Sequence, residues 1–240
     1  MAQVTTPGAL PLLLDASHRR QIRHSASWTV GIAVLGLLNL IACAYLEQFI
    51  GARNAPDGFM LFLAVESGFL LLTGAAVVNT ELEIIARKTR VLPVTAAQRY
   101  NFVILSLARH KAMQMIAGTG LFAVGILGPT SPLVIAGRVG MTALLMLLIF
   151  ALMSTLTILR VRPGASGGSI MAITGLVLAG LVVFAAVMSP GPILQVLYPL
   201  RWTMQGVLAI QHGMVLPALR YAAGLLLLAG ACVFLGRRYA

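Results

Sequence analysis

The largest group of charged residues in this chain lies in one polar segment, residues 80–111, between two long apolar runs. The segment reads TELEIIARKTRVLPVTAAQRYNFVILSLARHK and holds six of the seventeen lysines and arginines and two of the six carboxylates. These residues are Glu81, Glu83, Arg87, Lys88, Arg90, Arg99, Arg109 and Lys111. Side chains of these types form ion pairs and meet charged surfaces, so we expect the segment to dock onto a cytoplasmic partner.

The residue patterns that enzymes need are missing from the chain. A nucleotide-binding loop requires a lysine after a glycine, but Lys88 and Lys111 follow arginine and histidine. No cluster of His, Cys, Asp and Glu has metal-ligand spacing, no G-x-S-x-G motif occurs, and six scattered carboxylates do not supply a two-metal site. We therefore predict no catalytic, metal-binding or cofactor-binding residues here.

The composition is that of a membrane protein. Of the 240 residues, 59% are hydrophobic and 10% are charged, and the mean hydropathy is +0.95. Soluble domains carry about a quarter charged residues. The net charge of +11 does not indicate nucleic-acid binding, because the basic residues fall between apolar runs and no nucleic-acid-binding motif is present. Cys43 and Cys232 lie inside apolar runs, which favours small packed side chains over a disulfide.

Six apolar runs are long enough to cross a hydrocarbon core, which requires about 20 helical residues. They predict an all-α polytopic fold, a single transmembrane domain over residues 1–240. The expected spans are 28–50, 59–79, 102–128, 133–159, 169–189 and 215–235. The third should begin as a cytoplasmic extension, because Arg109 and Lys111 are costly deep in lipid.

The distribution of basic residues predicts the orientation. With the N-terminus inside, thirteen lysines and arginines fall on the inner side and four on or near the outer side. The inner set is Arg19, Arg20, Arg23, Arg87, Lys88, Arg90, Arg99, Arg109, Lys111, Arg160, Arg162, Arg237 and Arg238; the outer set is Arg53, Arg138, Arg201 and Arg220. Both termini are therefore expected in the cytoplasm.

Two further segments are expected at membrane surfaces. In residues 1–27 leucines precede basic residues, which predicts an amphipathic interfacial helix; a disordered basic tail is the alternative. Residues 189–214 are too apolar for a solvated loop and too broken by proline for another span. We expect them to form short re-entrant helices in the outer leaflet, with Tyr198 and Trp202 at the interface.

The central segment 80–101 contains two matches to the helix capping box, Thr80 to Glu83 and Thr95 to Gln98, with Pro93 between them. They predict a short helix over 81–90 and a second helix that starts at Thr95 and runs into the third span. On the short helix Leu82, Ile85, Ala86 and Thr89 share a face, and Glu83 and Arg87 form an i,i+4 ion pair. The alternative is a solvated basic loop that only sets orientation.

Two charged residues fall inside expected spans, Glu66 in the second and Arg138 in the fourth. Charges at this depth usually find partners, so we hypothesise that the two form an intramembrane ion pair. A structural staple and a gating role both remain open for the pair.

The layout resembles the ABC-2 type permeases, the membrane subunits of type V ATP-driven exporters. Two stretches carry the likeness: Glu81-Leu82-Glu83-Ile84-Ile85 through Arg90-Val91-Leu92-Pro93-Val94-Thr95, and Leu194-Gln195-Val196-Leu197-Tyr198-Pro199-Leu200-Arg201-Trp202. The resemblance implies a permease of the bacterial cytoplasmic membrane that pairs with a second copy, identical or paralogous. Two separate ATPase subunits would bind ATP and Mg²⁺ and would drive the transport of a substrate.

The resemblance also assigns roles to residues. It implies that 81–90 is a coupling helix seated on the ATPase and that its motion passes into a long third helix. The docking residues would be Glu81, Leu82, Glu83, Ile85, Arg87, Lys88, Arg90 and Pro93, and the outer gate would be Tyr198, Pro199, Arg201 and Trp202. A membrane scaffold whose basic loop binds a non-ATPase partner is the alternative. A secondary transporter or channel is less favoured, because the midplanes of the spans carry few polar groups.

Overall fold

The computed structural model describes residues 33–34, 36–38, 40–41, 55–74, 79–126, 131–161 and 198–240, which contain helices and no β-strand. The helices are α3 (Ala55–Thr73), α4 (Asn79–Arg90), α5 (Ala96–Arg109), α6 (Lys111–Ile126), α7 (Pro132–Val161), α9 (Tyr198–Gln211) and α10 (Val215–Tyr239). The all-α class is confirmed for this part of the chain. The expected interfacial helix at 1–27 and the span at 169–189 lie outside it, as does most of the span at 28–50.

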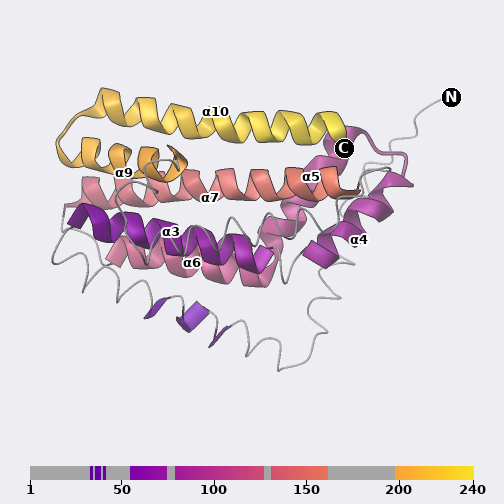
Figure 1. Ribbon diagram of the computed structural model, residues 1–240, viewed down its shortest axis with the longest axis horizontal. Helices are drawn as coiled ribbons and strands as arrows, with labels where there is room; N and C mark the ends of the chain where they lie inside the picture. The colour runs from indigo at the N-terminus through magenta and orange to yellow at the C-terminus, as the bar shows by residue number, and fades with distance from the viewer. Residues whose placement is uncertain are drawn as a thin grey trace.

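Helix α7 lies at the centre of the bundle and contacts α3, α4, α5, α6, α9 and α10. Figure 1 shows it between α10 and α9 on one side and α3 and α6 on the other. Its side chains are apolar or small and polar around nearly the whole helix, which is the pattern of a helix packed on all sides. Its bounds differ by two residues or fewer from the expected span at 133–159.

Among the described helices, α7 and α10 are the two that are long and apolar enough to cross a membrane. They have 30 and 25 residues, and the mean hydropathy of their most apolar stretch is 2.4 and 1.9. In α7, 61% of that stretch is buried by the rest of the protein, whereas in α10 the buried share is only 17%. Helix α10 therefore presents a long apolar surface to its surroundings.

Contacts between side chains give the relative directions of two pairs of helices. Glu66 of α3 lies against Gly120 of α6, and Gly74 lies near Met113, so α3 and α6 are antiparallel. The hydroxyl of Thr155, near the end of α7, lies 2.7 Å from the carbonyl oxygen of Cys232 near the end of α10, so these two helices are parallel. In Figure 1, α4, α5 and the ends of α7 and α10 gather at one end of the bundle.

Helices α9 and α10 form a helical hairpin at the opposite end. Gly213 has a φ of +69°, and the amide of Met214 donates to the carbonyl oxygen of Ala209 at 2.7 Å, which closes α9 with a Schellman turn. The ring of Trp202 then packs on Gly224, where a side chain would overlap it. Of the short helices expected in 189–214, α9 is described, and residues 189–197 lie outside the described part.

The expected continuous helix from Thr95 into the third span is wrong. Helix α5 ends at Arg109, His110 is extended (φ −66°, ψ 124°), and α6 begins at Lys111. In an unbroken helix Arg109 and Lys111 would point about 200° apart, so one of them would face the packed side. With the break, both of these side chains are exposed while His110 is buried.

Tyr100 joins α5 to the ends of α7 and α10. Its ring is fully buried, and its hydroxyl donates to the carbonyl oxygen of Ala151 at 3.2 Å and lies 3.5 Å from the hydroxyl of Thr155. Burial raises the pKa of Tyr100, so its hydroxyl stays protonated and able to donate at neutral pH. The ring lies directly on Gly236 of α10. A small residue is needed there because helices approach closely where side chains are absent.

This contact predicts opposite effects for two glycines of α10. A β-carbon at Gly236 would overlap the Tyr100 ring, whereas one at Gly230 meets no atom within 4 Å. We expect Gly230→Ala to be neutral or stabilising by up to about 1 kcal/mol through helix propensity. Gly236→Ala should be net destabilising, because overpacking costs about 1–3 kcal/mol. The check is the thermal unfolding midpoint of each purified variant in a mild detergent; equal shifts would contradict the packing.

Candidate functional site

The candidate site is built on α4, which is held against the bundle by one face. Leu82, Ala86 and Thr89 lie on this face and are buried, and the helix contacts α5 and α7. The hydroxyl of Thr89 donates to the carbonyl oxygen of Ala86 at 3.0 Å, so this buried hydroxyl keeps a hydrogen bond. The amphipathic pattern is therefore confirmed, and the chain itself covers the apolar face that the pattern marks out.

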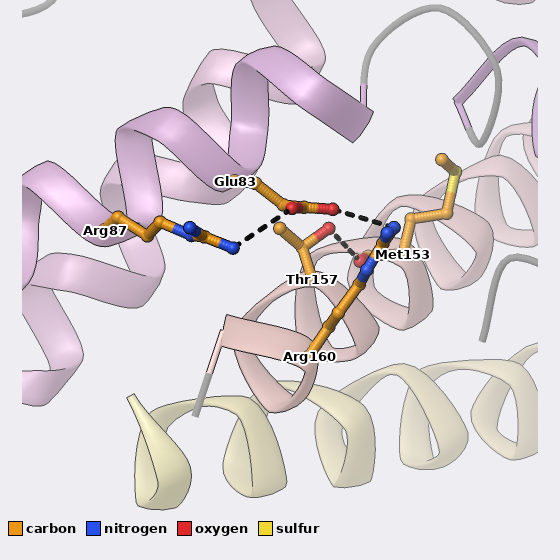
Figure 2. Close-up of polar contacts among 5 residues, drawn as sticks. All are labelled: Glu83, Arg87, Met153, Thr157 and Arg160. Carbon is orange, nitrogen blue, oxygen red and sulfur yellow. Dashed lines mark hydrogen bonds and ion pairs between the residues drawn. The ribbon is translucent and has the colours of Figure 1, made fainter. Parts of the chain in front are cut away.

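Glu83 fixes α4 to the end of α7. Its Oε1 lies 2.7 Å from Nη1 of Arg160, and its Oε2 lies 3.8 Å from Nη2 of Arg87 (Figure 2). The side chains of Glu83 and Arg160 are 15% and 22% exposed, whereas that of Arg87 is 72% exposed. The expected i,i+4 pair with Arg87 is present. The shorter and better shielded contact is the one with Arg160.

Arg160 is well placed to receive this carboxylate. It lies in the last turn of α7, where the carbonyl ends of the helix favour a positive charge. One turn earlier, the hydroxyl of Thr157 donates to the carbonyl oxygen of Met153 at 2.9 Å, which keeps that polar side chain satisfied within α7 (Figure 2). Sequence reasoning missed Arg160 as a site residue, because nothing in its local pattern points to a partner so far along the chain.

The first expected capping box is not formed as predicted. Helix α4 begins at Asn79, which places Thr80 inside the first turn rather than at the N-cap. The carboxylate of Glu83, which the box would direct to the backbone of Thr80, is engaged by two arginines instead. An ion pair at 2.7 Å is a stronger interaction for this carboxylate than a hydrogen bond to an uncharged amide.

The second capping box is confirmed. The Thr95 hydroxyl accepts from the amide of Gln98 at 3.3 Å, and the Gln98 side chain accepts from the amide of Thr95 at 2.9 Å. Pro93 is exposed and lies in the break between α4 and α5. The capping box fixes the start of α5 at Ala96, six positions after α4 ends at Arg90.

The opposite side of α4 is open to a partner. Ile84 is 52% exposed, and Arg87 and Lys88 are exposed beside it on the same side of the helix. Val91, 86% exposed, follows directly after the last helical residue. Two apolar side chains therefore flank two cations, which is a surface suited to an acidic partner with apolar pockets.

Arg99 ties α5 to both neighbouring elements at this end. Its Nε donates to the carbonyl oxygen of Thr89 at 3.4 Å, and its Nη1 donates to the backbone oxygen of Ala240. Burial and the nearby positive charge of Arg90 lower the pKa of this guanidinium. Sequence reasoning counted Arg99 only as a positive charge, whereas the structure gives it a connecting role.

The remaining expected docking residues are distributed around α4. Ile85 and Arg90 are half-buried, so each contributes only part of its side chain to the outer surface. The side chain of Glu81 lies outside the described residues. The exposed surface at α4 therefore contains fewer of the expected docking residues than the sequence indicated, and it also contains Ile84 and Val91.

The expected outer gate lies on α9, at the other end of the bundle. Tyr198 is its first residue, and Pro199, Arg201 and Trp202 follow in the first turns, all three half-buried. Trp202 faces α10 through Gly224. This segment is thus a packed helix beside α7 and α10, and its role as a gate remains a prediction.

Glu66 and Arg138 are both buried in the bundle. The guanidinium of Arg138 lies over the ring of Phe59, 4.5 Å from its centroid, while the Glu66 carboxylate lies against Gly120. Phe59 and Glu66 are separated by about 10 Å along α3. This spacing does not by itself bring the two charges together, and their ion pair remains a prediction.

The Glu83 contacts predict a difference between two double-mutant cycles. Combining Glu83→Gln with Arg160→Gln should reveal a coupling of about 1–3 kcal/mol, because the pair is short and shielded. The matched cycle of Glu83→Gln with Arg87→Gln should give a coupling below about 0.5 kcal/mol, as exposed i,i+4 pairs do. Thermal unfolding of the single and double variants measures both couplings; equal values would contradict the assigned geometry.

The described residues of the site form ion pairs, a capping box and packing contacts. In this part of the chain, no three His, Cys, Asp or Glu side chains are close enough together to hold a metal ion. Comparison with protein-family models, with curated proteins and with solved structures finds no match to this chain.

Proposed function

We propose that the chain is the permease subunit of an ATP-driven exporter of the ABC-2 type, with α4 as the helix that docks onto a separate ATPase. The observation that carries the proposal is the division of α4 into two faces. One face is locked to α7 through Glu83 and Arg160, and the other presents Ile84, Arg87, Lys88 and Val91 outward. A helix built in this way can receive a push from a partner and pass it to the bundle.

The apolar surface of α10 supports the membrane part of the proposal. A soluble protein rarely exposes a large contiguous apolar surface, because water disfavours it. Leu216, Leu219, Leu227 and Phe234 are all more than half exposed on this helix. Lipid is the surrounding that stabilises such a surface, with α10 as the sixth of six spans and both termini in the cytoplasm.

The contacts at the inner end define how the motion would travel. Because the chain breaks at His110, a push on α4 does not reach α6 through one rigid helix. It reaches α7 directly through Arg160, and it reaches α10 through α5, where Tyr100 lies on Gly236. The parallel helices α7 and α10 would then move as a unit, a shift of rigid elements that is common in switching proteins.

The full complex would contain two permease copies, identical or paralogous, above two ATPase subunits that bind ATP and Mg²⁺. The permease copies would lie in a bacterial cytoplasmic membrane. The outer helix α9 would take the position of the gate, with Trp202 anchored on α10. The alternative, a membrane scaffold that binds a non-ATPase partner through α4, makes a different prediction for purified complexes.

The docking surface predicts which charges an ATPase needs. The tagged chain is purified gently from its native membrane at low salt, and ATP hydrolysis is assayed in the eluate. Wild-type chain should carry ATPase activity, and Arg87→Glu/Lys88→Glu should lose most of it, at least about tenfold, because two repulsive contacts replace two attractive ones. Both side chains point away from the bundle, so the fold should be retained.

The matched control is Arg237→Glu/Arg238→Glu, which makes the same change in net charge at the end of α10. This variant should keep the ATPase. Wild-type chain without any associated ATP hydrolysis would contradict the permease function and would leave the scaffold in its place. Equal loss in the two double variants would show that net charge, and not the α4 surface, binds the partner.

A further inference from the structure

The inner end of the bundle carries several cations that no described carboxylate pairs with. Glu83 is the last carboxylate in the sequence, and thirteen lysines and arginines follow it. In the described part of the chain, Glu66 is buried and Glu83 is held by Arg160 and Arg87. Glu83 therefore neutralises only Arg160 and Arg87 among the cations of the inner end.

Four of these cations form what we call the inner rim: Arg109 and Lys111, on either side of the α5–α6 break, and Arg237 and Arg238, at the end of α10. All four are exposed, and none of them forms an ion pair with a carboxylate of the described residues. Arg237 donates to the amide oxygen of Asn101 at 3.0 Å, an uncharged acceptor that orients the guanidinium and leaves its charge in place.

Each half of the inner rim continues an exposed apolar surface. On α6, Phe122 lies on the same side of the helix as Lys111 and is 59% exposed, while Met115 between them lies against Gly36. On α10, Phe234 lies one turn before Arg238 and is 64% exposed. A cation that ends an apolar stripe is the arrangement of side chains that reach from the hydrocarbon to the head groups.

The length of the stripe on α10 agrees with this placement. Between Arg220 in its first turns and Arg237 in its last turn, the helix carries no charged residue. These two arginines are about 26 Å apart along the axis, close to the roughly 30 Å of a hydrocarbon core. Arg220 then marks the outer boundary, and Arg237 and Arg238 mark the inner one.

We propose that the inner rim binds the phosphates of anionic phospholipid head groups in the adjacent leaflet. The proposal depends on the membrane location contained in the proposed function, but on no ATPase. Lipid is favoured over a protein partner because the rim cations extend lipid-facing stripes, whereas Arg87 and Lys88 lie on α4 away from any such stripe. Clustered Lys and Arg beside a membrane helix attract anionic lipid in this way.

The test uses the full chain reconstituted without an ATPase. Vesicles of phosphatidylcholine are compared with vesicles in which half of the lipid is phosphatidylglycerol, and lipid retained after detergent extraction is counted by native mass spectrometry. Wild-type chain should retain phosphatidylglycerol in excess and should unfold at a higher temperature in the anionic vesicles. In Arg109→Gln/Lys111→Gln/Arg237→Gln/Arg238→Gln the excess should fall by roughly fivefold or more.

A matched variant keeps the test decisive. Arg87→Gln/Lys88→Gln removes two exposed cations outside the inner rim and should retain the wild-type excess. If the fourfold variant does not fold, the two pairs Arg109→Gln/Lys111→Gln and Arg237→Gln/Arg238→Gln are tested separately. Added salt should also reduce the excess of phosphatidylglycerol on the wild-type chain, because salt screens the attraction between charges.

Three outcomes would overturn the proposal. If wild-type chain enters both kinds of vesicle but retains no excess phosphatidylglycerol, the lipid-binding proposal is overturned and the proposed membrane function is not. An equal loss in the control variant would show that net charge, not the inner rim, attracts the lipid. A chain that enters neither kind of vesicle would overturn it together with the proposed membrane function.

Discussion

The ion pair between Glu83 and Arg160 is the contact on which the arrangement of the inner end depends. It joins a helix that follows α3 to the end of the central helix, and it is the only described contact at this end between two fully charged side chains from different helices. Both side chains are largely shielded from water, which strengthens the attraction between their charges. Removing one of the two side chains would leave the other charge shielded and without its partner, which is destabilising. Helix α4 therefore has one position relative to α7.

Fixing α4 in this way determines what the next elements can do. The polypeptide turns at Pro93, restarts at Thr95 and brings Tyr100 between α7 and α10. The close approach at Gly236 leaves no space for the ring to move without moving α10. The inner end is thus a connected set of contacts, in which ion pair, capping box and aromatic packing each position the next.

Local patterns in the sequence were sufficient wherever a local interaction decides the structure. The capping box at Thr95 needs only residues three apart, and hydropathy alone gives the bounds of α7 to within two residues and the start of α10. The same reasoning was wrong at Thr80 and at His110, where tertiary contacts decide. A carboxylate that can reach Arg160 does not cap its own helix, and a helix that must expose both Arg109 and Lys111 has to break between them.

The site itself was only partly readable from the sequence for the same physical reason. Periodicity identified the two faces of α4, but it cannot say which face the protein keeps for itself. The apolar face is buried on α5 and α7, so the free surface is the mixed one with Ile84 and the two cations. The structure also shows on which surfaces the excess positive charge lies. On α4 it lies beside the exposed apolar side chains of Ile84 and Val91, whereas on α10 it ends an exposed apolar stripe. The lack of any carboxylate after Glu83 therefore leaves cations on two different kinds of surface, and the two proposals assign a different partner to each.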